Sequence, residues 1–211
     1  MHRSFTLSTL FIFAALFLFP FLAPNPVHAE ANSRMAALES SVNAALEILK
    51  NPELANLENR EARRQQLRDT LYPQFDFSRM AQGATGRKWR KFSSDQKERF
   101  TTLFKQLLER TYLGMIERYQ GEEVSFVKEV EQSKSVVRVD SIIYSKGQKY
   151  DMSYRMGKTG DQWKVFDVII EGVSVIANYR AQFKQLLRKS RPDIEGMLAK
   201  LEEKVSKPEA E

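Results

Sequence analysis

Residues 163–183 read WKVFDVIIEGVSVIANYRAQF, and the spacing of the apolar side chains changes partway through this stretch. In its first eight residues the pattern predicts a strand in which Val165, Asp167 and Ile169 point to one side of a sheet and the residues between them point to the other. Both faces would then carry large apolar groups. We therefore expect a strand that is central in its sheet or covered on both sides.

A helix is predicted directly after this strand. Gly172 can make the sharp turn between the two elements, and Ser174 is placed to cap the first turn of the helix. Apolar residues then recur at helical spacing: Val175, Ile176, Tyr179, Phe183, Leu186 and Leu187. The strand, the glycine corner and the helix are expected to form one hydrophobic wedge.

The first 29 residues have the features of a secretory signal peptide. Arg3 supplies a basic start, residues 5–22 hold no charged side chain, and a small-residue cleavage site ends at Ala29. A membrane anchor is the alternative, because the apolar run is about as long as the shortest membrane-spanning helix. We predict cleavage after Ala29, one domain at residues 30–205 and a disordered tail at residues 206–211.

The composition excludes several kinds of site from the exported part. The chain has no cysteine, and both of its histidines, His2 and His28, lie in the predicted signal peptide. Ser-His-Asp and Cys-His catalytic sites and zinc sites built on His or Cys are therefore excluded. We expect no metal and no cofactor. The formal net charge of +6 favours anionic lipid headgroups or acidic partners over nucleic acid in an exported protein, and the alternative on charge alone is a soluble protein whose basic character has no such role.

Helices are predicted on both sides of a group of strands. Their spacing indicates helices at residues 31–51, 59–71, 75–81 and 93–121 and a short terminal helix that begins near Pro192. The longest has the clearest signals, because Ser93 and Gln96 form a capping box at its start and Gly121 can end it.

Four strands lie between these helices, at residues 124–131, 135–145, 149–156 and 163–170. The connections at Gly147 and at residues 157–161 are short, which favours an antiparallel meander. The expected fold class is α+β: a curved four-stranded antiparallel meander sheet with helices packed on one face, enclosing an apolar pocket.

Three groups of residues resemble one protein family. They are Phe75-Asp76-Phe77 with Met80-Ala81, Trp89 followed by Gln96 and Phe100, and DVIIEGVS at residues 167–174 followed by Asn178-Tyr179-Arg180 and Gln182-Phe183. In this order they resemble the MlaC family of periplasmic phospholipid-binding proteins, also called toluene-tolerance ABC transporter auxiliary components. The resemblance covers nearly all of the exported chain. Thr85 departs from it, since the family is expected to favour leucine there.

The resemblance implies a soluble phospholipid carrier in the periplasm, here expected as a monomer. It implies that the carrier shuttles lipid between an outer-membrane lipoprotein complex and an inner-membrane ABC transporter complex with its substrate-binding subunit, and so maintains outer-membrane lipid asymmetry. It implies no reaction and no catalytic residue, with phospholipid as cargo. Exposing the roughly 30 methylenes of two acyl chains to water costs on the order of 25 kcal/mol, so a carrier must enclose the tails.

The expected lipid contacts are apolar residues on the inner faces of the long helix, the sheet and the wedge. They are Phe104, Leu108, Met115, Val139, Ile143, Met152, Tyr154, Val168, Ile170, Val175, Ile176 and Tyr179. Periodicity identifies a face without telling whether it meets protein or lipid, so each of these residues is equally a candidate for ordinary core.

Three basic residues are candidates for contact with a headgroup or a partner: Arg180, Lys88 and Arg90. The alternative for Arg180 is a structural ion pair with Glu171 across the glycine corner. Lys88 and Arg90 flank Trp89, and the alternative for these two residues is a place in a solvated loop.

Two other functions stay open on the sequence alone. One is a periplasmic hydrolase that uses two carboxylates, for which Asp151 and Asp167 are candidates if they face each other across neighbouring strands. The other is an interaction module with a filled core and no ligand.

Overall fold

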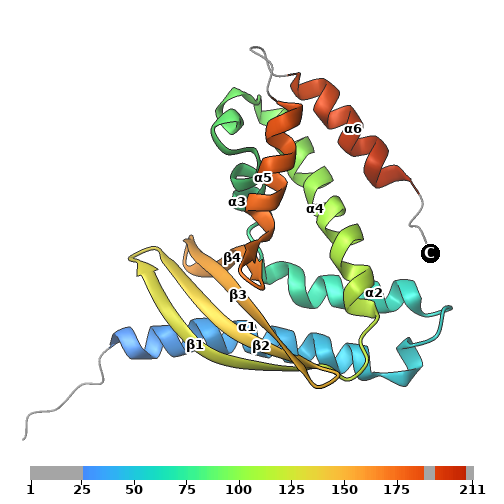
Figure 1. Ribbon diagram of the computed structural model, residues 1–211, viewed down its shortest axis with the longest axis vertical. Coiled ribbons are helices and arrows are strands. Elements are labelled where there is room, and N and C mark those ends of the chain that lie inside the picture. Colours follow the sequence, from blue (N-terminus) through green and yellow to red (C-terminus); the bar gives the residue numbers. More distant parts are fainter. Residues whose placement is uncertain (1–25, 188–192, 208–211) are drawn as a thin grey trace, which may run out of the picture.

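The structure is a computed structural model that describes residues 26–187 and 193–207 (Figure 1). Most of the predicted signal peptide, Pro192 and most of the predicted tail lie outside these ranges. Within them, no helix combines the length and the apolar character needed to cross a bilayer.

Helices precede and follow the sheet, as the sequence predicts. They are α1 (Pro26–Lys50), α2 (Arg60–Leu71), α3 (Phe77–Thr85), α4 (Ser94–Glu117), α5 (Val175–Leu186) and α6 (Ile194–Ser206), with 3-10 turns η1 (Pro52–Leu54), η2 (Tyr72–Gln74) and η3 (Gly86–Lys91). The predicted capping box at the start of α4 is confirmed, because the backbone N–H of Gln96 donates to the Ser93 hydroxyl and the Gln96 side chain accepts in return.

The strands form one antiparallel sheet in the order β1-β2-β3-β4-β5. They are β1 (Glu123–Ser133), β2 (Val136–Ser145), β3 (Gln148–Thr159), β4 (Gln162–Ile170) and β5 (Val173–Ser174). The prediction of four strands omitted β5, which pairs back on Ile169 and Ile170 after a turn in which Glu171 and Gly172 both have positive φ. A strand of two residues has no periodicity of its own, so the pattern could not reveal it.

One face of the sheet is apolar. Directly opposed residues on neighbouring strands project from the same face, which arranges the apolar side chains in cross-strand rows. The rows are Val137–Met156–Val165, Val139–Tyr154–Val168, Ser141–Met152–Ile170 and Ile143–Tyr150. The opposite face is polar, and there Arg138 and Ser153 both donate hydrogen bonds to Asp140.

α1 lies across the sheet (Figure 1). Leu38 packs into the buried cluster of the first two rows. Arg34 is 5% exposed and forms an ion pair of 2.6 Å with Glu129, while its guanidinium lies 4.7 Å from the ring centroid of Trp163. Burial raises the pKa of the Glu129 carboxyl above its ordinary value. The ionised form of this carboxyl therefore depends on Arg34.

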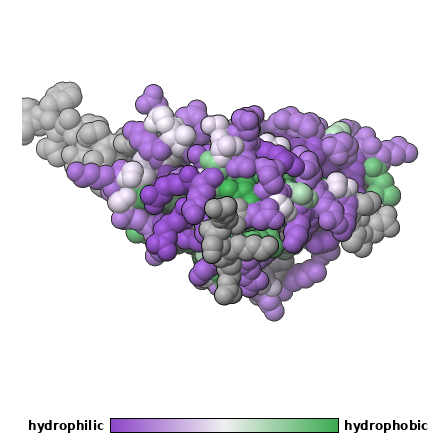
Figure 2. Space-filling model, turned by 90° about the horizontal axis from the view of Figure 1, so that it is seen from above, coloured by the Kyte–Doolittle hydropathy of each residue, from purple (hydrophilic) through white to green (hydrophobic). Residues whose placement is uncertain are grey.

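The helices α3 to α6 form a second layer beside β4 (Figure 1). Its interior is aromatic: the ring centroids of Phe100 and Phe183 are 5.3 Å apart, and those of Phe104 and Tyr179 are 5.1 Å apart, both in edge-on contact. Seen from the end of the molecule where this helical layer lies, the surface is mainly hydrophilic, with small apolar patches (Figure 2). The apolar stripe predicted on α4 is thus largely the core of the helical layer.

β4 joins the two layers. Val168 packs against both the sheet cluster and the helical cluster. Phe75 forms a parallel bridge with Val165, and the backbone N–H of Asp76 donates to the Val165 carbonyl oxygen at 2.9 Å. Because Asp76 also caps α3, the same segment fixes α3 against the edge of the sheet.

The predicted alternation along β4 is wrong at one point. The pairing with β3 shifts between Arg155 and Met156, so that Phe166 has no directly opposed residue. Val165 consequently lies on the same face as Val168, although the sequence pattern assigned these two to opposite faces. Asp167 remains on the other face of β4, which is polar and basic.

Several predicted element ends also differ from the structure, and α3, for example, ends at Thr85 rather than at residue 81. β3 continues to Thr159, whereas residues 157–161 were expected to form a turn. Gly157 pairs with Val136 and with Lys164 in the strand, and the guanidinium of Arg79 occupies the space that a side chain at this position would fill. α4 ends at Glu117 rather than at Gly121, since the Arg118 backbone N–H already donates to the Met115 carbonyl, which tightens the last turn.

Truncating a valine under α1 should destabilise the fold. Val137 is fully buried, so Val137→Ala removes packed methyl groups and should lower the free energy of unfolding by about 2 kcal/mol in urea denaturation. Val127→Ala is the matched control, because this strand valine is 53% exposed and should change stability by less than about 0.5 kcal/mol. Equal effects at the two positions would contradict the packing of α1 on this face.

Candidate functional site

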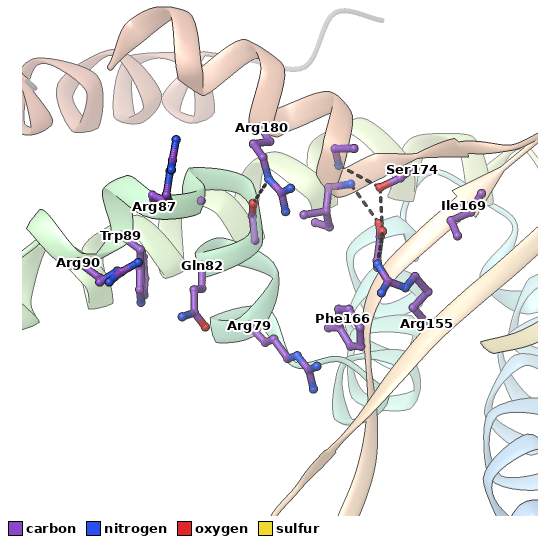
Figure 3. A pocket seen from close by; sticks show the side chains of 15 residues that line it. Arg79, Gln82, Arg87, Trp89, Arg90, Arg155, Phe166, Ile169, Ser174 and Arg180 are labelled. Atoms are coloured by element: carbon purple, nitrogen blue, oxygen red, sulfur yellow. Dashed lines mark hydrogen bonds and ion pairs between the residues drawn. The ribbon is translucent and has the colours of Figure 1, made fainter. Parts of the chain in front are cut away.

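An open pocket of about 550 Å³ lies where the helical layer meets the polar side of β4 (Figure 3). Five arginines line it, from α3, η3, β3 and α5: Arg79, Arg87, Arg90, Arg155 and Arg180. Among the described residues that line it, the only carboxylate is Asp167. The floor includes the apolar side chains of Phe166, Trp89 and Ile176. The pocket is therefore strongly basic with apolar surfaces between the charges.

Asp167 connects β4 with the start of α5. Its carboxylate accepts a hydrogen bond from the Ser174 hydroxyl at 2.7 Å and one from the backbone N–H of Ile176 at 3.1 Å. The Ser174 hydroxyl in turn accepts from the backbone N–H of Ala177, which confirms the predicted cap. Asp167 is 4% exposed. The Asp167 carboxylate thus holds the start of α5. Its Oδ2 atom also lies 3.9 Å from Nη1 of Arg155.

Aromatic and backbone contacts orient three of the arginines. The guanidinium carbon of Arg79 lies 3.8 Å from the ring centroid of Phe166, and that of Arg155 lies 5.0 Å from the same ring. Arg180 donates from Nε to the Gly83 carbonyl oxygen at 2.6 Å. Gly83 permits this approach of α3 to α5, because a Cβ there would lie 2.8 Å from Ile176 Cγ2.

The apolar face of the sheet is a second candidate surface. α1 covers its first rows, but the rows that follow are less covered. Ile143, Met152 and Ile170 are only partly buried, and Tyr150 is 39% exposed. Apolar surface of this kind is suited to an apolar ligand.

The twelve predicted lipid contacts fall into three groups. Six lie on the apolar face of the sheet: Val139, Ile143, Met152, Tyr154, Val168 and Ile170. Five are buried in the helical cluster: Phe104, Leu108, Val175, Ile176 and Tyr179. Met115 is 57% exposed and joins neither group. The structure thus brings half of the predicted residues together on one surface.

Of the predicted basic contacts, Arg180 and Arg90 line the basic pocket, while Lys88 is not among its lining residues. Arg79, Arg87 and Arg155 line it too and were not singled out in the sequence. Arg79 and Arg155 are single basic residues in α3 and β3 with the pattern of ordinary solvated side chains, so no sequence signal could have grouped them. Arg87 belongs to the basic run at residues 86–91 in which Lys88 and Arg90 were singled out, and the same run could have indicated it.

The predicted pair of Glu171 and Arg180 is wrong. Arg180 contacts the Gly83 carbonyl, and the Glu171 carboxylate instead accepts from the backbone N–H of Asp151. Glu171 has a φ of 49° in the turn before β5, which directs its side chain back to β3.

The two carboxylates considered for a hydrolase do not face each other. Asp167 is opposite Arg155, whereas Asp151 is opposite Ile142, and four residues of β3 correspond to roughly 13 Å. In the part of the chain that the structure describes, no group of three or more His, Cys, Asp or Glu side chains is arranged to hold a metal ion.

Residues 39–203 match the protein family described as MlaC protein. The chain belongs to the MlaC family. The Haemophilus influenzae binding protein MlaC of the intermembrane phospholipid transport system is 24% identical over 148 residues, which are 67% of this chain and 68% of that protein. The toluene tolerance protein ttg2D of Pseudomonas putida is 27% identical over 108 residues, half of each chain.

A solved structure supports the same assignment of this MlaC-family chain. The phospholipid-binding protein of Ralstonia solanacearum, determined in complex with a phospholipid, superposes with a TM-score of 0.72 at 28% sequence identity. The match covers 82% of this chain and 97% of that protein. The α+β fold is therefore shared with a protein whose structure contains a phospholipid.

Replacing Asp167 should affect stability, because its carboxylate is buried and accepts two hydrogen bonds. Asp167→Asn removes the charge and one acceptor, and should lower the free energy of unfolding by about 2 kcal/mol. Asp151→Asn is the matched control at an exposed position of the same sheet and should have an effect below about 0.5 kcal/mol. Chemical denaturation measures both variants, and an Asp167→Asn protein as stable as wild type would contradict the capping role.

Proposed function

We propose that this MlaC-family protein is a periplasmic carrier of phospholipid within a phospholipid transport system. The observation that carries the proposal is the family match over residues 39–203. It is supported by the relatives, since one is named as the binding protein of an intermembrane phospholipid transport system and another was determined with a phospholipid bound.

The acyl tails would lie against the apolar face of the sheet, at the rows that α1 covers least. Apolar side chains there replace the contacts that the tails make in a bilayer, and each methylene removed from water contributes about 0.8 kcal/mol. Met152 and Tyr150 suit this purpose, because flexible thioether and broad aromatic groups adapt to chains of different shape. A closed pocket would then form only when the helices around this face rearrange on the lipid.

The partners that follow are those of the family: an outer-membrane lipoprotein complex that supplies or accepts lipid, and an inner-membrane ABC transporter complex with its substrate-binding subunit. The protein would act as a monomer, without a reaction of its own. A hydrolase with Asp151 and Asp167 as its acid and base has no support, because Asp167 is engaged in capping α5.

Native mass spectrometry of the protein purified from a bacterial periplasm tests the carrier proposal. We expect a complex whose added mass equals one or more phospholipids, confirmed by lipid extraction. A lipid-free, folded protein that also takes up no lipid from vesicles would contradict the proposal.

A pair of neighbouring variants tests the face proposed for the tails. Ile143 and Ile142 are both partly buried on β2 but project from opposite faces. Ile143→Asp places a charge on the apolar face and should reduce the amount of bound lipid at least about tenfold, because a charge is poorly tolerated beside acyl chains. Ile142→Asp should retain lipid near the wild-type amount. Circular dichroism checks that both variants fold, and equal lipid loss in both would show that the tails lie elsewhere.

A further inference from the structure

The basic pocket carries more positive charge than its own residues neutralise. Its five arginines face a single carboxylate, Asp167, whose oxygens already accept from Ser174 and Ile176. Across the described residues, Arg87 and Arg90 form no hydrogen bond or ion pair, and Arg79 contacts Phe166 only through the ring face. Guanidinium donors of Arg87 and Arg90, which line the pocket, are thus unused by the described residues.

The geometry of these donors favours a tetrahedral anion. A guanidinium presents parallel N–H groups that match two oxygens of a carboxylate or a phosphate. The arginines come from four elements around the pocket, as Figure 3 shows, so an anion inside it is approached from several directions. A phosphate group offers oxygens in several directions, whereas a carboxylate offers two in one plane. The cavity of about 550 Å³ is also larger than a carboxylate needs.

Three of the arginine side chains that line the pocket are held in place by other residues of the protein before any ligand binds. The ring of Phe166 lies near both Arg79 and Arg155, and Arg79 also rests against Gly157. Arg180 is held by the Gly83 carbonyl. Side chains held in this way lose less conformational entropy when a ligand binds.

We propose that this pocket is a binding site for a phosphate group, either that of a lipid headgroup or free phosphate. It lies on the polar side of β4, with Asp167 and Arg155, while Val168 and Tyr154 project from the apolar side. The site is thus separate from the face proposed for the acyl tails, and phosphate binding does not require that proposal to hold.

A charge-matched pair of double variants tests the site. Arg87→Gln/Arg90→Gln removes two lining arginines, whereas Lys88→Gln/Lys91→Gln removes the same charge from the same 3-10 turn at positions that do not line the pocket. Binding of inorganic phosphate is measured by isothermal titration calorimetry at constant ionic strength. Binding to vesicles of phosphatidylcholine with and without phosphatidylglycerol is measured by flotation, and circular dichroism establishes that each variant folds.

The wild type is expected to bind at least one of the two probes, and the arginine variant to bind it about tenfold more weakly or worse, since two charge-assisted contacts are lost. The lysine variant should stay within about threefold of wild type, the small change expected for exposed charges. Binding of phosphate alone would identify free phosphate as the ligand, and binding of vesicles, with or without phosphate, would identify a lipid headgroup.

The proposal is overturned if the folded wild type binds neither probe, if the arginine variant binds as well as wild type, or if the lysine variant loses as much affinity as the arginine variant. The last result would mean that general positive charge, rather than this pocket, attracts the anion. Absence of lipid from the purified protein would count against the carrier proposal only, and would leave the comparison of phosphate affinities unchanged.

Discussion

The arrangement of the two layers depends on the buried carboxylate of Asp167. It lies on β4 and accepts hydrogen bonds from Ser174 and from the first turn of α5, so the end of the sheet and the start of the helical layer are joined at one side chain. The positive end of a helix stabilises a negative charge placed there, which explains how the carboxylate is tolerated when nearly all of it is buried. This contact helps to fix the direction in which α5 leaves the sheet, and α5 forms one side of the basic pocket.

β4 separates two surfaces of opposite character. The irregular pairing at Phe166 brings Val165, Val168 and Ile170 to one face and leaves Asp167 on the other. The apolar face continues beyond the part that α1 covers, whereas the polar face ends at a pocket that five arginines line. A protein that handles an amphiphilic molecule between charged membrane surfaces can use both, the first for hydrocarbon and the second for anionic oxygen.

Much of the fold could be predicted, because its signals are local. Helical spacing, the capping box of Ser93 with Gln96 and the cap at Ser174 act within a few residues of one another, and the structure contains each of them. The site was predictable only in part. Periodicity grouped the apolar residues of the sheet correctly on one face, but it also selected Ile176, Tyr179 and others that fill the helical core. It missed Arg79 and Arg155, since an isolated arginine has no pattern, and it did not select Arg87 from the basic run at residues 86–91.

The sequence by itself determined the types of element, the turn at Gly172, the apolar content of the sheet and the resemblance to the MlaC family, because these depend on residue identity and short-range spacing. The tertiary structure alone decided which residues meet. Strand register set Asp151 apart from Asp167, the guanidinium of Arg79 packed against Gly157 of β3, and Arg180 bound Gly83 instead of Glu171. Each of these contacts joins segments that pack together only in the complete fold, so no local pattern encodes them.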